Sequence, residues 1–173
     1  MKKPYKTFVA AGVICLVSTY LVSARANAQD KEQAELAKAL QSVRVTLGQA
    51  LATSARGGTP ISGKFEVEEG KLQLSVYTMK GDTFAEVIVD HTTGKVAKTE
   101  AITSGDDLAA AKSQSAAMAK AKRSLRDAIA GAIKANGGFR AVSVTPGLSG
   151  GRPVATIALL QGQTFKTVTQ PLD

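Results

Sequence analysis

Apolar and polar positions along the chain follow two periods, one helical and one extended, which alternate. From about residue 36 to residue 54, apolar or small side chains recur every three or four positions, and the same spacing returns between residues 108 and 132. Each stretch therefore predicts a helix with one apolar face. The glycine pairs 57–58 and 137–138 follow these stretches and are expected to end the helices as left-handed caps.

Within each predicted helix lies a motif that could interrupt it. Thr46-x-x-Gln49 and Ser124-x-x-Asp127 resemble capping boxes, in which a hydroxyl and a polar side chain satisfy the free backbone groups at a helix start. A long helix could break into two at either motif. The apolar spacing runs through both motifs, so we expect each helix to be continuous.

After each glycine pair the period changes to alternation, which predicts strands. Six such stretches occur, and they cover residues 64–68, 71–76, 84–89, 140–145, 154–160 and 165–169. Glu69-Gly70 is expected to form a hairpin turn, and a longer turn is expected from Pro146 to Pro153. Helices with one apolar face and sheets with one apolar face must bury these faces together, which indicates an α+β fold.

The helix-then-strands pattern occurs twice. TLGQAL at residues 46–51 matches SLRDAI at residues 124–129, and GDTF at residues 81–84 matches GQTF at residues 162–165. Order and spacing are kept, which indicates an internal repeat. We predict two units, residues 29–103 and 104–173, each a helix packed on a small antiparallel sheet of three to four strands. Units of this size have thin cores and would gain by packing together.

The first 28 residues have the pattern of a signal peptide. Lys2, Lys3 and Lys6 precede an apolar run from residue 8 to residue 22, and Ala26-Asn27-Ala28 supplies the small-x-small cleavage pattern. The alternative is a retained membrane anchor, but a spanning helix needs about 20 apolar residues. We therefore predict cleavage after Ala28, a periplasmic or secreted location, and no stable membrane insertion after cleavage.

Composition limits the classes of partner. The formal charge is +8, but the predicted signal peptide holds four of the 22 basic residues and none of the 14 acidic ones, so the remainder carries 18 − 14 = +4. This modest charge, with 5% aromatic residues and no tryptophan, argues against nucleic-acid binding. Cys15, the only cysteine, would leave with the signal peptide, so stability must come from core packing.

Three segments of the first unit resemble the PepSY family: residues 46–51, the Gly-Asp-x-Phe turn at residues 81–84, and VDHTTGKV at residues 89–96. The second unit has the first two segments but ends without a Thr-Gly turn, as a truncated copy. The resemblance implies a helix on an antiparallel sheet, an exported or membrane-facing location, and a role in binding and restraining proteases or other envelope proteins. Asp90, Thr93 and Gly94 are the motif residues that it marks.

The closing turn also has a physical explanation of its own. Asp90 can accept hydrogen bonds from backbone amides two residues on, and Gly94 can adopt a positive φ before the chain extends again. Turn chemistry alone accounts for both residues. Candidates for partner contact are the large aromatic side chains of the strands, which could equally belong to the core: Phe65, Tyr77, Phe84 and Phe165.

Candidate catalytic and metal sites have simpler interpretations. Residues 147–151 satisfy the G-x-S-x-G pattern around Ser149, but a strand rather than a helix is expected to follow, as in a hairpin loop. His91 is the only histidine and has no cysteine or second histidine to complete a zinc site. Glu66, Glu68 and Glu69 lack the loop that wraps a calcium ion.

These observations predict an exported binding module rather than an enzyme, with no cofactor. Its partner would be a protein of the cell envelope, for example a protease, bound at exposed strand edges where an extended peptide can add a strand. The alternative is a periplasmic small-molecule or metal-binding protein that uses the cleft between the units or the acidic strand. A hydrolase acting through Ser149 is a third hypothesis.

Overall fold

The computed structural model describes residues 21–173, and the side chains of residues 29–173, as an α+β fold with one antiparallel sheet. The helices are α1 (Leu21–Ala39), the 3-10 helix η1 (Leu40–Ser42), α2 (Leu47–Ser54), α3 (Gly105–Met118) and α4 (Leu125–Ala135). The strands are β1 (Thr59–Glu68), β2 (Lys71–Lys80), β3 (Thr83–Val89), β4 (Val96–Ile102), β5 (Arg140–Ser149), β6 (Arg152–Gln161) and β7 (Thr164–Pro171). The predicted α+β class is confirmed.

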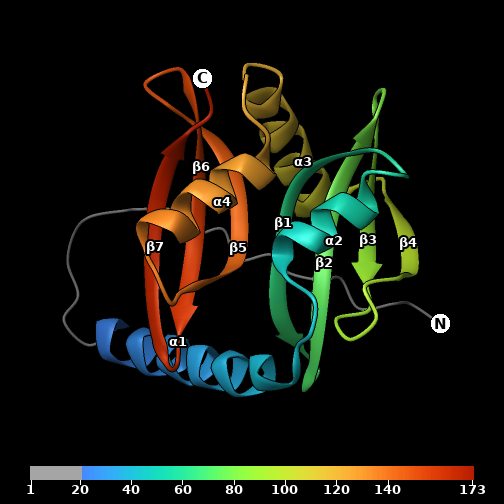
Figure 1. The fold of residues 1–173 in the computed structure, drawn as a ribbon. Helices are drawn as coiled ribbons and strands as arrows, with labels where there is room; N and C mark the ends of the chain where they lie inside the picture. The colour runs from blue at the N-terminus through green and yellow to red at the C-terminus, as the bar shows by residue number, and fades with distance from the viewer. Residues whose placement is uncertain (1–20) are drawn as a thin grey trace.

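The seven strands form a single sheet in the order β4-β3-β2-β1-β5-β6-β7. Its centre is the pairing of β1 with β5, where Gly63 lies opposite Val144 and Lys64 opposite Ser143. The strands of the first half therefore occupy one side of the sheet and those of the second half the other (Figure 1). The structure thus has one seven-stranded sheet where the sequence predicted two small sheets of three to four strands.

The signal peptide predicted for residues 1–28 lies outside the part whose side chains the structure describes. Within residues 21–173, no helix combines the length and the apolar character that a membrane span requires.

The expectation of continuous helices was wrong, because both motifs cap a helix start, the first as a complete capping box and the second through its serine alone. Thr46 Oγ1 accepts from the backbone N–H of Gln49 at 3.2 Å, and Gln49 Oε1 accepts from the N–H of Thr46 at 2.8 Å. Ser124 Oγ likewise accepts from the N–H of Asp127 at 3.1 Å. These bonds satisfy donors that a new helix start leaves free. α2 and α4 therefore begin after an extended break in the chain.

The glycine pairs do not both act as left-handed caps. Gly138 has φ +85°, as expected, but α2 ends at Ala55 in a right-handed conformation, and neither Gly57 nor Gly58 has a positive φ. Gly58 is required for a different reason. A Cβ on this residue would lie 2.8 Å from the carbonyl oxygen of Met79, so only glycine allows the chain to pass β2 so closely.

The hairpin turns were predicted in part. Glu69 and Gly70 both have positive φ and form the expected β1–β2 turn. In the second half, β5 continues through Pro146 to Ser149, and the turn is only Gly150-Gly151, so the predicted longer turn was wrong. Proline is tolerated here because β5 pairs with β1 only at Ser143 and Val144, which leaves the backbone edge beside Pro146 free.

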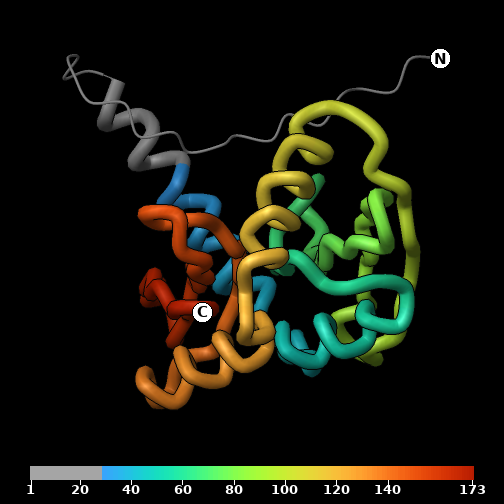
Figure 2. The backbone as a smooth tube through the Cα atoms, turned by 90° about the horizontal axis from the view of Figure 1, so that it is seen from above, coloured from blue at the N-terminus to red at the C-terminus, as the bar shows by residue number. Residues whose placement is uncertain are grey.

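Helices cover both faces of the sheet. α2 and α4 lie side by side in front of it, and the view from above places α3 on the opposite face (Figures 1 and 2). The main core lies between the sheet and α2 and α4, and includes Leu47, Leu51, Ile129 and Val144. A smaller cluster of Ile61, Tyr77 and Ala111 lies under α3, which belongs to the second half in sequence.

The strand registers repeat along the chain. Lys80 pairs with Thr83, and Gln161 with Thr164, so both positions advance by 81 residues (161 − 80 and 164 − 83). Gly63–Val76 and Val144–Ile157 are related by the same step. β1 and β5 also carry their irregularities at equivalent places, between residues 60 and 62 and between residues 141 and 143.

Candidate functional site

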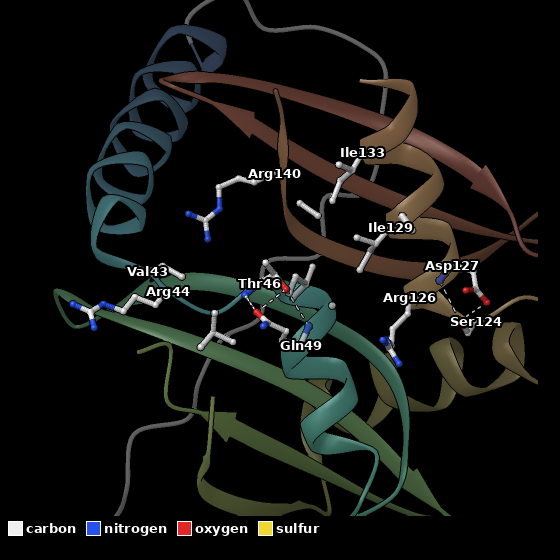
Figure 3. Close-up of a pocket in the computed structure, with 15 residues that line it drawn as sticks. Val43, Arg44, Thr46, Gln49, Ser124, Arg126, Asp127, Ile129, Ile133 and Arg140 are labelled. Atoms are coloured by element: carbon white, nitrogen blue, oxygen red, sulfur yellow. Dashed lines mark hydrogen bonds between the residues drawn. The ribbon is translucent and has the colours of Figure 1, made fainter. Parts of the chain in front are cut away.

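A groove of about 680 Å³ lies between α2 and α4, where the two halves of the chain meet (Figure 3). We call it the interhelical groove. One wall is the segment that leads into α2, and the other is the exposed side of α4 with the start of β5. Its lining residues are Val43, Arg44, Val45, Thr46, Leu47, Gly48, Gln49, Ser124, Arg126, Asp127, Ile129, Ala130, Ile133, Arg140 and Ala141.

The walls of the groove are largely apolar. Figure 3 shows Ile129 and Ile133 directed from α4 toward the space between the helices, opposite Val43. Ile133 retains 36% of its accessible surface, which makes it one of three large aliphatic side chains of residues 29–173 that remain exposed. An exposed apolar side chain in a concave site favours binding of an apolar group, since burial removes that surface from water.

The ends of the groove are positively charged. Arg140 and Arg44 lie at one end, where the guanidinium of Arg44 is directed away from the space between the helices, and Arg126 lies at the other end (Figure 3). Asp127 is the only carboxylate of the lining. Asp127 is already engaged, since it accepts from Ser124 Oγ at 2.7 Å. This hydrogen bond, more than any other contact, holds the pKa of Asp127 below its usual value.

Arg140 is the most constrained of the three arginines. Its Nη1 donates to the carbonyl oxygen of Leu40 at 3.1 Å, and its guanidinium lies 5.6 Å from the centre of the Phe65 ring. The side chain is half-buried, and burial lowers its pKa. No carboxylate of residues 29–173 forms an ion pair with Arg140. A half-buried cation without an acidic partner favours an anionic group in the groove.

The predicted motif turn at residues 90–94 contacts one wall of the interhelical groove. The N–H groups of Thr92 and Thr93 donate to Asp90 Oδ1 at 2.9 and 2.7 Å, and Gly94 has φ +73°, as the sequence indicated. The turn presents the carbonyl oxygen of His91, which accepts from the N–H groups of Arg44 and Val45, both at 3.1 Å. The turn therefore fixes the segment that forms one wall of the groove.

The second half holds its own helix start in the same way. The carbonyl oxygen of Leu172 accepts from the N–H groups of Lys122 and Arg123 at 2.6 and 3.0 Å. These two residues precede Ser124 as Arg44 and Val45 precede Thr46. Leu172 is fully buried and takes this role without a Thr-Gly turn. The carbonyl anchor is thus common to both halves.

The four aromatic candidates are not gathered at one site. Phe65 is 3% exposed and lies in the main core beneath the helices. Tyr77 is 5% exposed under α3, and its hydroxyl donates to Asp107 Oδ1 at 2.9 Å. Burial, more than this bond, raises the pKa of Tyr77. Phe84 and Phe165 are half-buried against the smaller and the main cluster, respectively.

The remaining candidates for chemistry lie in hairpins and turns. Ser149 is exposed at the end of β5, and β6 follows the turn, so no helix follows the serine. His91 lines a separate hollow of about 430 Å³ together with Glu68, Glu69 and Asp90. Among the described residues, no three His, Cys, Asp or Glu side chains come together as a metal-binding group.

Sequence reasoning missed most residues of the groove. Arg44, Arg126, Ile133 and Arg140 were not singled out as site residues. One signal was available for Arg140, because an arginine opens a strand whose next positions are apolar. That α4 would lie beside α2 could not be read from local patterns.

Comparisons with known proteins add little. No known protein-family profile matches the sequence, and no curated protein is significantly similar to it. One solved structure matches, that of a protein from Clostridium difficile 630 proposed to be a lipoprotein, with 13% identity and a TM-score of 0.33 over 68% of this chain and 86% of that one. Similarity at this level carries no conclusion about fold or function.

Proposed function

We propose that this chain is an exported, non-enzymatic binding module of two tandem PepSY-like units that holds a segment of a protein partner in the cell envelope. The observation that carries the proposal is the interhelical groove, with apolar walls and three arginines against one engaged carboxylate. Such a surface is complementary to an apolar segment that carries acidic side chains. A protease restrained in this way is the partner that the sequence resemblance favours.

The repeated strand registers support the tandem arrangement. A constant step of 81 residues relates the β1–β2 and β5–β6 pairings and the β2–β3 and β6–β7 pairings (157 − 76 and 164 − 83). With this step, Gly63 and Val144 are equivalent positions, and they lie opposite each other at the centre of the sheet. The two units would then be related by an approximate twofold axis through this pair. The groove lies where their helices meet.

Site-specific photocrosslinking tests the binding proposal. A benzophenone amino acid placed at Ile133 samples the groove, and the same group at Leu148 samples the distant β5–β6 hairpin. Both residues are exposed, at 36% and 47%. We expect a discrete protein adduct from position 133 in the native compartment and none from position 148. Equal adducts from both positions, or none from position 133, would contradict the proposal.

An anionic small molecule is the second candidate for the groove. The volume of the interhelical groove, about 680 Å³, lies within the range of roughly 300–1,000 Å³ typical of ligand pockets. A small anionic ligand at one hundred times its Kd would stabilise the folded chain by about 2.7 kcal/mol. Its binding would therefore raise the melting temperature of the purified chain, which a panel of anionic metabolites can test. Such a shift without any crosslink from position 133 would favour this candidate over a protein partner.

A further inference from the structure

The two outer edges of the sheet are not equivalent. β3 and β7 occupy matching places, because Met79 pairs with Phe84 as Leu160 pairs with Phe165. The outer side of β3 is paired along its length with β4. The outer side of β7 has no strand beside it among residues 21–173. A strand edge of this kind offers unpaired N–H and C=O groups.

Matching side chains of β3 and β7 differ in burial. Val87 on β3 is 2% exposed, whereas Val168, at the matching place on β7, is only half-buried. Val89 is 1% exposed, and the matching Gln170 is half-buried. β7 is therefore less covered at these positions than β3 is.

β7 is also poorly protected against strand addition. Its eight residues carry one charged side chain, Lys166, and its proline stands only at the last position. By contrast, β4 at the other edge carries the exposed ion pair of Lys98 with Glu100. Charges and prolines are the usual means by which edge strands avoid pairing. β7 is thus the more receptive edge of the sheet.

We infer that the outer edge of β7 binds an extended segment of a partner protein as an antiparallel strand, in the register that β4 adopts on β3. In that register Ile102 lies opposite Phe84 and Ala101 opposite Ala85. The bound segment would therefore place an apolar side chain opposite Phe165 and its neighbour opposite Lys166. An acidic neighbour suits Lys166, whose Nζ contacts only the neutral Asn136 Oδ1, at 2.6 Å. This surface is separate from the interhelical groove and does not depend on it.

The chain supplies its own probe, because β4 shows which sequence fits such an edge. The probe is a synthetic peptide of residues 95–103 with Ala101→Glu, labelled for fluorescence anisotropy. Two further versions carry N-methyl groups on alternate amides, so that each blocks the hydrogen bonds of one edge of the peptide. We expect one version to bind like the parent and the other to bind at least about tenfold more weakly, the loss expected for several net backbone hydrogen bonds. Equal binding of both versions, or no binding of the parent, would overturn the inference.

A disulfide assay fixes the place and the register. Thr167 on β7 matches Glu86, which lies opposite Glu100 on β4. In full-length protein with Cys15→Ser and Thr167→Cys, a peptide cysteine at position 100 should crosslink in a glutathione buffer, because directly opposed residues have the spacing that a disulfide needs. A peptide with its cysteine at position 98 should crosslink far less to Thr167→Cys. As a control, a protein with Thr99→Cys on β4 in place of Thr167→Cys should not crosslink to the peptide. Equal crosslinking yields from peptide positions 98 and 100 would overturn the inference. A homodimer of the Thr167→Cys chain in place of the peptide adduct would overturn it as well.

Discussion

Gly63 on β1 lies opposite Val144 on β5 at the centre of the sheet, where the two halves of the chain meet. Gly63 also lies directly against α2, because a Cβ on it would lie 3.2 Å from Leu47 Cδ1 and 3.3 Å from Leu51 Cδ2. The absence of a side chain at this position lets the helix pack closely on the strand. Close packing of α2 on β1, at the centre of the sheet, thus depends on the absence of a side chain at Gly63.

Adding a methyl group at this position should weaken the fold. We expect Gly63→Ala to lower the free energy of unfolding by about 1–3 kcal/mol, because the two leucines must move in a packed core. Gly48→Ala is the matched control, since its Cβ would meet nothing within 4 Å and alanine favours the helix by about 0.5–1 kcal/mol. Urea unfolding curves compare the two. If Gly63→Ala raised the free energy of unfolding instead, the packing of α2 on β1 at Gly63 would be loose.

The buried residue near the chain end should contribute strongly to stability. Leu172 is fully buried, and its carbonyl oxygen holds the segment before α4. Leu172→Ala removes the side chain and leaves a cavity, so we expect a loss of about 2–5 kcal/mol in the free energy of unfolding. The exposed neighbour Pro171→Ala should change it by less than about 0.5 kcal/mol. Thermal unfolding compares the two variants, and similar melting temperatures would contradict a strong contribution of the buried Leu172 side chain to stability.

The motif turn should make stability depend on pH in acid. Hydrogen bonds from the N–H groups of Thr93 and Thr92 hold the pKa of Asp90 below its ordinary value of 3.8. The ionised form is therefore favoured in the folded state. The stability that it contributes is present above about pH 4 and is lost as the pH falls through the folded-state pKa, which lies below 3.8.

Asp90→Asn tests this dependence, because asparagine does not titrate. We expect the urea midpoint of the wild-type chain to fall more than that of the variant between about pH 5 and pH 2.5. Asp82→Asn, in the exposed β2–β3 turn, should keep the wild-type decline. If Asp90→Asn showed an equally steep decline, the turn carboxylate would not be the group responsible.

The arginine at the groove should affect binding more than stability. Arg140→Met keeps much of the side-chain length, removes the bond to Leu40, and also removes the cost of a half-buried charge. We expect a change in unfolding free energy within about 1 kcal/mol but a clear loss of photocrosslinking from position 133. Arg56→Met, at an exposed arginine outside the groove, should leave the yield unchanged. Equal yields from all three chains would mean that Arg140 does not recognise the partner.

Local patterns predicted much of the fold. Strand alternation placed six of the strands, and turn chemistry placed Glu69-Gly70 and the Asp90 turn, because these depend on neighbouring residues alone. The helix breaks were misjudged although their capping residues were noticed, since apolar spacing was given more weight than the caps. β4 was not recognised as a strand, because its side chains are mostly exposed and do not alternate clearly.

The candidate site was not predictable in the same way. The groove exists because β1 pairs with β5 and brings α2 beside α4, a contact between residues far apart in the chain. Arg140 gains its significance only from Leu40, a hundred residues earlier, and from Phe65. The aromatic candidates were chosen for size, and size serves the core as readily as a binding surface.

The shared core requires that the two halves fold as one unit, because α3 of the second half covers Ile61 and Tyr77 of the first. The direct test is to express residues 29–103 and residues 104–173 separately and follow each, and their mixture, by near-ultraviolet circular dichroism and urea unfolding. We predict that residues 29–103 alone show no cooperative transition and that the mixture regains one close to that of the intact chain. Cooperative unfolding of residues 29–103 alone, with the midpoint of the intact chain, would contradict folding of the two halves as one unit.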